Sequence, residues 1–269
     1  MMSLIILASA TGSPGVTTSA LGMALTWPRD VLLCDADRDP SQAVLAGYLN
    51  GVDAGMRSIA NLARQHRDAP MTIESILAET VPLTSDETPS RRFLPGFTHP
   101  GSAAIFRAAW PGFADMLAYL GNTGTDTIVD AGRIGREGLP APLLANAQLV
   151  LVVVRSTLRS LAAARLYLPY LRDHMAQVGG LGQLALLVVG PGRPYSPSDI
   201  EAEFGVPIWG SIPLQDDAVV LSDGDQASRR FADGPLMRSF RALSSHTRTA
   251  FDTTQAHIDA GRPLEMARS

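Results

Sequence analysis

The sequence predicts a single α/β domain built on one doubly wound, mainly parallel sheet with helices on both faces. Short apolar runs alternate with stretches of helix length along most of the 269 residues, as in right-handed strand–helix–strand units. The runs are continuously apolar rather than alternating, which indicates strands that are covered on both faces. A composition of 46% hydrophobic and 18% charged residues fits a well-buried core.

Seven segments are predicted strands: residues 4–8, 31–34, 92–94, 127–129, 149–154, 185–189 and 208–209. The predicted helices between them include residues 16–26, 102–120 and 158–177. We expect residues 1–255 to form the domain and residues 256–269, which contain Gly261 and Pro263, to form a C-terminal tail. The polar segment 82–92 is predicted to be an exposed connection.

Composition narrows the class of protein. Cys34 is the single cysteine, so the chain has no internal disulfide and fits a reducing, cytoplasmic compartment. No run reaches the roughly 18 apolar residues that an integral membrane helix needs, and no basic region precedes the apolar N-terminal stretch, so we expect no signal peptide. The net charge of −4 argues against a generally basic nucleic-acid binder.

The segment 10–18, which reads Ala-Thr-Gly-Ser-Pro-Gly-Val-Thr-Thr, joins the first predicted strand to the first helix. Such a loop gathers free backbone N–H groups at the positive end of the helix dipole, and both features attract phosphate. Gly12 and Gly15 allow unusual backbone angles, and hydroxyls from Thr17 and Thr18 in the first turn can reach a metal or a phosphate. The alternative is an ordinary turn made of small residues.

The basic residue of a phosphate-binding loop is missing. Val16 stands where a lysine is expected, and all 22 basic residues of the chain are arginine, so no lysine elsewhere can substitute. The sequence therefore indicates either a nucleotide enzyme with altered chemistry or a protein that has kept the shape of the loop and lost the chemistry.

Acidic residues follow two of the predicted strands. Asp35, Asp37 and Asp39 come after the second strand, and Asp130 comes after the fourth, followed by Gly132. Ligands of open α/β sheets bind at the carboxyl ends of the strands. A carboxylate there can orient water or hold magnesium through its water shell. The alternative for the first group is a polar turn in which Asp39 caps the next helix.

Together these residues resemble the deviant Walker P-loop ATPases of the ParA/MinD family, which includes the CpaE/TadZ proteins of pilus and secretion assembly. The family loop, Lys-Gly-Gly-x-Gly-Lys-Thr-Thr/Ser, is similar to residues 11–18. The family's Asp-x-Asp segment resembles Asp35 to Asp37, and its strand-end aspartate resembles Asp130. Two later segments, 149–157 and 208–217, are similar to a core strand of the family and to its adenine-side loop, so the resemblance spans most of residues 3–225.

The resemblance implies a cofactor, ATP or ADP with magnesium, and a set of site residues. Asp37 would position the attacking water with support from Asp35, and Thr17 and Asp130 would act on magnesium, the latter through water. The nucleotide-binding residues that the resemblance implies are Gly12, Ser13, Pro14, Gly15, Val16, Thr17, Thr18, Pro213 and Leu214.

The departures from the family pattern predict altered chemistry. Val16 replaces the lysine of the β- and γ-phosphates, and Thr11 replaces the signature lysine that reaches across an ATP-bound dimer. Gly190 stands where an asparagine commonly reads adenine. Phosphoryl transfer relies on positioning and electrostatics, so we expect hydrolysis to be weak or absent while binding persists. The implied role is a pseudo-ATPase that positions or assembles a partition, septum, pilus or secretion machine with protein partners, with a homodimer left open.

Two alternatives remain open at this stage. In the first, the chain is an active ATPase in which Arg38 or Arg133 replaces the missing lysine, because both follow acidic strand ends and a guanidinium can fork onto phosphate. The competing expectation is that both are solvated loop arginines. In the second alternative, an arginine tract binds DNA non-specifically, although a solvated helix face is the competing interpretation. The tract comprises Arg229, Arg230, Arg238, Arg241 and Arg248.

Overall fold

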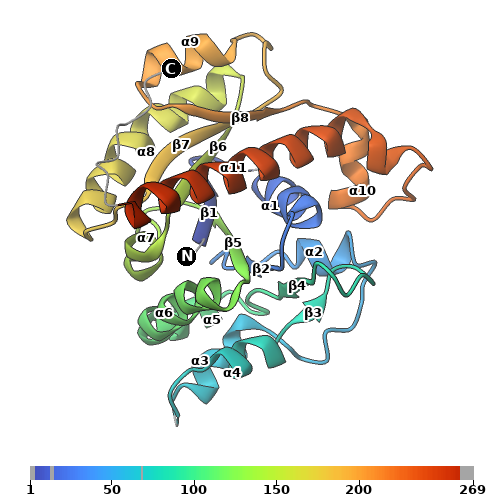
Figure 1. The fold of residues 1–269 in the computed structure, drawn as a ribbon, viewed down its shortest axis with the longest axis vertical. Coiled ribbons are helices and arrows are strands. Elements are labelled where there is room, and N and C mark those ends of the chain that lie inside the picture. Colours follow the sequence, from blue (N-terminus) through green and yellow to red (C-terminus); the bar gives the residue numbers. More distant parts are fainter. Residues whose placement is uncertain (1–3, 13–14, 68, 261–269) are drawn as a thin grey trace.

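The computed structural model describes residues 4–12, 15–67 and 69–260. Its centre is an eight-stranded sheet of order β3-β4-β2-β5-β1-β6-β7-β8 (Figure 1). Neighbouring strands are parallel except for the antiparallel pair of β3 and β4, which confirms the predicted mainly parallel sheet. The strands are β1 Leu4–Ser9, β2 Val31–Asp35, β3 Val81–Pro82, β4 Arg91–Leu94, β5 Asp126–Arg133, β6 Leu149–Arg155, β7 Gln183–Val189 and β8 Ile208–Ile212.

Helices cover both faces of the sheet, as predicted. Because successive side chains of a strand point to opposite faces, Ile5 and Leu7 enter one core, whereas Leu4, Ile6 and Ala8 enter the other. The first core is covered by α1 Val16–Thr26, α2 Ala43–Ala46, α10 Val219–Ser222 and α11 Pro235–Asp259. The second core is covered by α3 Ile59–Gln65, α4 Ile73–Ala78, α6 Trp110–Leu120, α7 Ala141–Asn146, α8 Leu158–Gln177 and α9 Pro197–Phe204.

The structure matches the predicted helices 16–26 and 158–177 in α1 and α8. The predicted helix 102–120 is divided into α5 Ser102–Ile105, the 3-10 helix η1 Phe106–Ala109 and α6. Further 3-10 helices are η2 Gly121–Thr123, η3 Asp216–Ala218 and η4 Phe231–Asp233. Among the described residues, no helix is both long enough and apolar enough to span a membrane.

The bounds of one predicted segment are wrong. The predicted exposed connection 82–92 contributes Pro82 to β3 and Arg91 and Arg92 to β4, and its Leu83 is buried. The last helix, α11, continues through residues 256–259, which are mostly exposed, and the division of the chain into a domain and a C-terminal tail stays a prediction. The remainder of that tail, from residue 261, lies outside the described residues.

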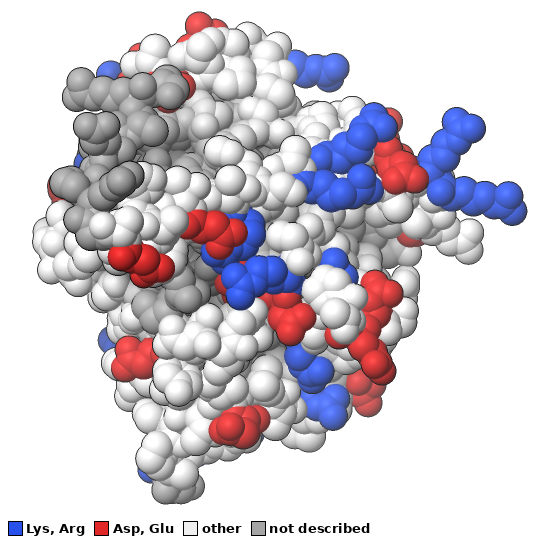
Figure 2. All heavy atoms as spheres, in the orientation of Figure 1, with Lys and Arg blue, Asp and Glu red and all other residues white. Residues whose placement is uncertain are grey.

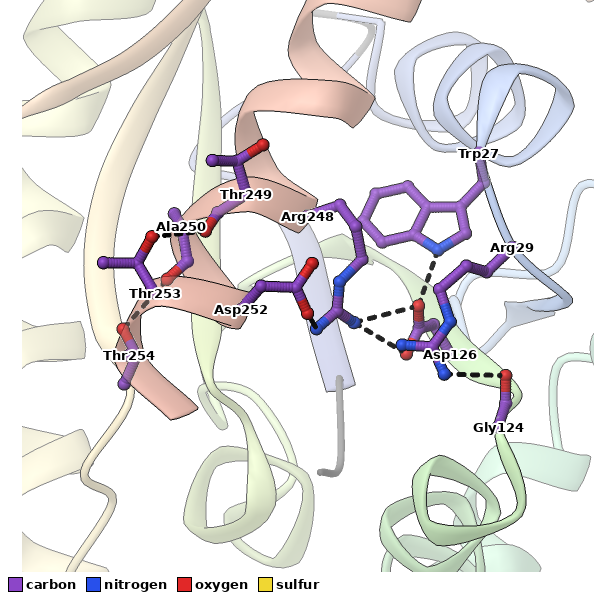
Figure 3. Close-up of polar contacts among 10 residues, drawn as sticks. All are labelled: Trp27, Arg29, Gly124, Asp126, Arg248, Thr249, Ala250, Asp252, Thr253 and Thr254. Atoms are coloured by element: carbon purple, nitrogen blue, oxygen red, sulfur yellow. Dashed lines mark hydrogen bonds and ion pairs between the residues drawn. The ribbon is translucent and has the colours of Figure 1, made fainter. Parts of the chain in front are cut away.

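A buried ion pair ties the last helix to the sheet (Figure 3). The carboxylate of Asp126, at the start of β5, accepts hydrogen bonds at 3.2 Å on each oxygen from Nη1 of Arg248 on α11. The indole N–H of Trp27, at the end of α1, donates to the same carboxylate at 2.8 Å. Asp252 binds the other guanidinium nitrogen. Both charges of the central pair are almost fully excluded from water, so each depends on its partner.

We predict that Arg248→Ala lowers the free energy of unfolding by about 3–5 kcal/mol, because it leaves the Asp126 carboxylate buried without its cation. Urea unfolding followed by circular dichroism measures this loss. Arg241→Ala is the matched control on the same helix, since Arg241 pairs with the exposed Asp233 at 3.5 Å. It should cost less than about 1 kcal/mol. Equal losses in the two variants would contradict the assignment.

Candidate functional site at the carboxyl edge of the sheet

Three central strands bring the predicted site residues to one edge of the sheet. β5 lies between β1 and β2, and its Asp130 stands opposite Leu7 of β1 and Asp35 of β2. The loop that follows β1 and the acidic segment that follows β2 therefore meet at the end of β5. This edge of an open α/β sheet is where ligands bind.

The loop ends at a glycine that starts α1. Gly15 has φ 99° and ψ 31°, a left-handed conformation that disfavours other residues, although a Cβ atom there would meet nothing within 4 Å. The first intrahelical bond runs from the Ser19 N–H to the Gly15 carbonyl, so the amides of residues 16–18 have no partner within the helix. Ser13 and Pro14, both predicted to bind nucleotide, lie outside the described residues.

Val16, at the position of the missing lysine, is part of the core. Its side chain is 6% exposed and packs in the apolar cluster that α1 and β1 share. It therefore supplies no polar group to the loop, and its predicted contribution to nucleotide binding is confined to its backbone N–H. Thr17 and Thr18, in the same helical turn, are half-buried.

Asp130 and Asp35 form a buried acidic pair across β5 and β2. Burial raises the pKa of the Asp130 carboxyl to about 6, although hydrogen bonds from the Thr17 hydroxyl and the Gly132 N–H act against the rise. Burial, reinforced by the charge of Asp130, also raises the pKa of Asp35 well above its usual range. Gly96 belongs to this site and was missed in the sequence, because a Cβ atom there would lie 2.5 Å from the Asp35 carboxylate.

Asp37 completes the acidic group. Its carboxylate lies directly on Gly132, where a Cβ atom would be 2.0 Å from Cγ. The Asp37 N–H donates to Oδ1 of Asp35 at 3.1 Å, which joins the two residues of the Asp-x-Asp segment. Burial raises the pKa of Asp37, and the N–H of Asp39 and the nearby arginines oppose that rise. The structure thus brings Asp35, Asp37 and Asp130 together, as their strand-end positions predict.

This arrangement suits a hard divalent cation held jointly with a ligand. The described residues contain no group of three or more His, Cys, Asp or Glu side chains placed to hold a metal by themselves. Magnesium usually keeps several waters and binds through one or two protein oxygens together with substrate phosphates. The Thr17 hydroxyl and the Asp130 carboxylate, which hydrogen-bond to each other, are the oxygens that fit this role.

The two arginines considered for the missing charge have different surroundings. Nη2 of Arg38 donates to the carbonyls of Ile134 and Gly138, and Nη1 lies 3.7 Å from Glu137. Arg38 therefore fastens the loop after β5, and the expectation of a solvated loop arginine is wrong for it. Arg133 is exposed, and its guanidinium covers Gly12, with Nη2 2.6 Å from the position of a Cβ atom.

A cavity of about 780 Å³ adjoins the loop on the side of α6, α7 and α8. Thr11, Gly12 and Asp37 form part of its wall, so it opens directly onto the acidic group. The arginines on its wall are Arg38, Arg107, Arg133 and Arg136.

The predicted base-side residues lie further along the same edge. Pro213 and Leu214 follow β8, and the N–H of Gly190, after β7, donates to the carbonyl of Ile212 at 2.9 Å. A Cβ atom on Gly190 would be 3.5 Å from Cβ of Leu214, whose residue is half exposed. Neither Pro213 nor Leu214 lines the cavity beside the loop. Because β6 separates β1 from β7, only an extended ligand could contact both places.

The C-terminal arginine tract is split by the fold. Arg248 is buried in its ion pair, so it is removed from the predicted basic surface. Arg229, Arg230, Arg238 and Arg241 remain exposed, and Figure 2 shows arginine side chains gathered near α10 and the start of α11 with acidic side chains among them. Arg238 donates to the carbonyl of Asp233 at 2.8 Å, and Arg241 pairs with its carboxylate.

Comparison with solved structures decides the fold. A ParA family ATPase from Chlorobium tepidum superposes with a TM-score of 0.72 at 14% identity, covering 91% of this chain and 100% of that one. The chain has the ParA/MinD fold. MinD from Pyrococcus horikoshii, complexed with Mg-ADP, gives a TM-score of 0.68 at 18% identity over 93% of this chain and 98% of that one.

A putative plasmid partition protein from Borrelia burgdorferi, bound to AMPPNP, gives a TM-score of 0.69 at 12% identity and covers 93% of this chain and 100% of that one. No protein-family model and no curated protein sequence matches the chain. At these identities the likeness establishes the ParA/MinD fold, and the chemistry of the site is argued from the residues themselves.

We predict that Asp130→Asn stabilises the protein at neutral pH. The folded-state pKa of about 6 exceeds the unfolded value of about 3.9. The folded protein therefore holds more protons than the unfolded chain between about pH 4 and pH 6, and its free energy of unfolding falls as the pH rises through that interval. The Asp130→Asn variant cannot ionise at this position, so its free energy of unfolding does not fall in this way. At pH 7 it should exceed that of wild type by about 2–3 kcal/mol.

Urea unfolding in EDTA at pH 4.5 and pH 7 measures this difference between variant and wild type, which should be larger at pH 7. Asp39→Asn is the control, because Asp39 is an exposed acid of the same segment, and it should change stability by less than about 0.5 kcal/mol. A destabilised Asp130→Asn variant at pH 7 would refute the assignment of the raised pKa.

Proposed function

We propose that this protein binds ATP or ADP with magnesium at the carboxyl edge of its sheet and hydrolyses the nucleotide weakly or not at all. In this proposal it is a cytoplasmic positioning or assembly factor, of the partition, septum, pilus or secretion type, that works through protein partners. The single observation that supports nucleotide binding best is the meeting of a glycine-capped helix start with the buried group of Asp35, Asp37 and Asp130. The ParA/MinD fold supports a positioning role.

The residues present fit such a ligand. Backbone amides at the start of α1 would hold the phosphates, together with the loop residues 12–15 that precede them. Magnesium would be held by the Thr17 hydroxyl and, through water, by Asp130, and it would neutralise the charge shared between phosphate and carboxylates. Asp37 would orient a water molecule near the terminal phosphate, with Asp35 fixing Asp37 through its N–H. Pro213 and Leu214 would lie near the base.

The weak hydrolysis follows from the packing of Val16. Removing one preorganised donor from a site that stabilises developing charge costs about 10²–10³ in rate. Here Val16 packs in the core, and Thr11 has no charge to contribute. Binding depends more on amides and metal than on those side chains, so it should persist. A protein of this kind uses nucleotide occupancy as a signal and does not depend on rapid turnover.

Protein partners are proposed by analogy with the solved neighbours. The structures of that fold include a MinC:MinD cell division protein complex from Aquifex aeolicus, with a TM-score of 0.67 at 16% identity. We propose that the nucleotide-loaded form of this chain likewise presents a surface to a protein partner, as a monomer or as a homodimer.

Isothermal titration calorimetry with Mg-ATP tests nucleotide binding directly. Wild type should bind, whereas Gly15→Glu should not, because its carboxylate would project into open space at the phosphate site. Thr17→Ala should bind more weakly with magnesium and be unchanged in EDTA. Thermal melts of both variants report their folding, because the left-handed backbone at Gly15 disfavours a side chain. If wild type hydrolysed many molecules of ATP per protein and the Asp37→Asn variant did not, the proposal of weak hydrolysis would be contradicted.

Non-specific DNA binding is the alternative proposal, supported by the four exposed arginines near α10 and α11. It predicts duplex binding that weakens steeply with salt and is reduced by the double substitution Arg238→Ala and Arg241→Ala. Fluorescence anisotropy with a labelled duplex at low and physiological salt measures both effects. No binding at low salt would remove this alternative.

A further inference from the structure

We propose that Arg133 supplies, from within the same chain, the positive charge that the loop lacks, and that its guanidinium binds the polyphosphate of the nucleotide beside Gly12. This inference rests on the proposed nucleotide binding and adds to it the identity of the cation. It also separates the two arginines that the sequence leaves as equal candidates.

The first argument is the position of the Arg133 guanidinium group against Gly12. Measured from the position of a Cβ atom on Gly12, Nη2, Cζ and Nε of Arg133 lie at 2.6, 3.1 and 3.2 Å. The guanidinium therefore lies where a side chain of residue 12 would begin, and a Cβ atom there would force the end of the Arg133 side chain to move. Gly12 thus makes room for this cation.

The second argument is how the backbone holds Arg133 in place. Arg133 is the last residue of β5 and stands opposite Ser9, the last residue of β1. The buried hydroxyl of Ser9 donates to the carbonyl of Thr11 at 2.6 Å and lies 3.5 Å from the carbonyl of Gly132. One side chain therefore links the start of the loop to the end of β5, which keeps the Arg133 backbone beside Gly12.

The third argument is that the charge of Arg133 is available. Within the part of the chain that the structure describes, Arg133 has no ion pair within 4.0 Å. Two of the other arginines on the cavity wall are engaged: Arg38 donates to two carbonyls of the loop after β5, and Arg107 pairs with Glu137 at 3.7 Å. Arg133 combines proximity to the loop with freedom to bind an anion.

The chemistry of arginine suits this place. A guanidinium stays charged at all physiological pH values and offers a planar fork of donors that matches two phosphate oxygens. Because Arg133 and Gly12 belong to one chain, the cation is present in the monomer. Nucleotide binding should therefore not require a second copy of the protein.

Calorimetry with Mg-ATP on wild type and three variants tests the proposal. Arg133→Ala should weaken the affinity by about 10-fold to 100-fold, the loss expected for a charged hydrogen-bonding group. Arg133→Lys should recover part of that loss. Arg136→Ala is the matched control, an exposed arginine three residues along that lines the same cavity, and it should stay within about 2-fold of wild type.

The outcomes separate the two claims. If wild type binds and Arg133→Ala binds equally well, the role of Arg133 is overturned while nucleotide binding stands. If wild type does not bind Mg-ATP at all, both the proposed function and the proposed role of Arg133 are contradicted. Arg133 is exposed, so the variant should fold, and an unchanged thermal melt confirms this.

A mixing experiment tests whether the cation acts within one chain. The Arg133→Ala variant has an intact loop but lacks the cation. The Gly15→Glu variant keeps Arg133, but its own loop cannot bind nucleotide. If Arg133 acted across a dimer, mixing the two variants would restore binding to the intact loop. The proposal predicts that the mixture binds no better than Arg133→Ala alone, and restored binding would overturn it.

Discussion

The site depends on two carboxylates that the fold forces together. Asp35 and Asp130 stand opposite each other on neighbouring parallel strands, and both are almost excluded from water. Their mutual repulsion and their desolvation make the ionised pair costly. The hydrogen bonds from Gly132, Thr17 and the Asp37 backbone reduce this cost but leave the pKa of Asp130 raised. In the proposed function, a divalent cation shared with a polyphosphate at the neighbouring helix start would offset the rest.

Val16, where a phosphate-binding loop is expected to carry a lysine, contributes apolar packing and no charge. Val16 fills space in the core between α1 and the sheet, so apolar contacts of its side chain help to hold the helix start in place. Two arginines lie at the ends of the neighbouring strands β2 and β5. Arg38 fastens the loop after β5, whereas Arg133 lies on Gly12. Arg38 thus has a structural role in that loop, whereas Arg133 has no ion pair among the described residues.

Much of this architecture was predictable because continuous apolar runs indicate buried parallel strands, whose carboxyl ends share an edge. The meeting of Asp35, Asp37 and Asp130 follows from that rule. Gly96 was not predictable, since its need for close approach comes from a carboxylate far away in the sequence. The strand β3 was not predictable either, because it has only two residues, one of them Pro82, and therefore shows no apolar pattern. Arg248 was misread as part of a basic surface, because nothing local to α11 reveals its partner on β5.

The most direct test of the account is the anomalous diffraction of manganese in crystals grown with a non-hydrolysable ATP analogue. The account predicts one strong peak between the Thr17 hydroxyl and the Asp130 carboxylate, with phosphate density against the amides at the start of α1. Nucleotide and metal bound elsewhere, or a loop edge without either at saturating analogue, would contradict it.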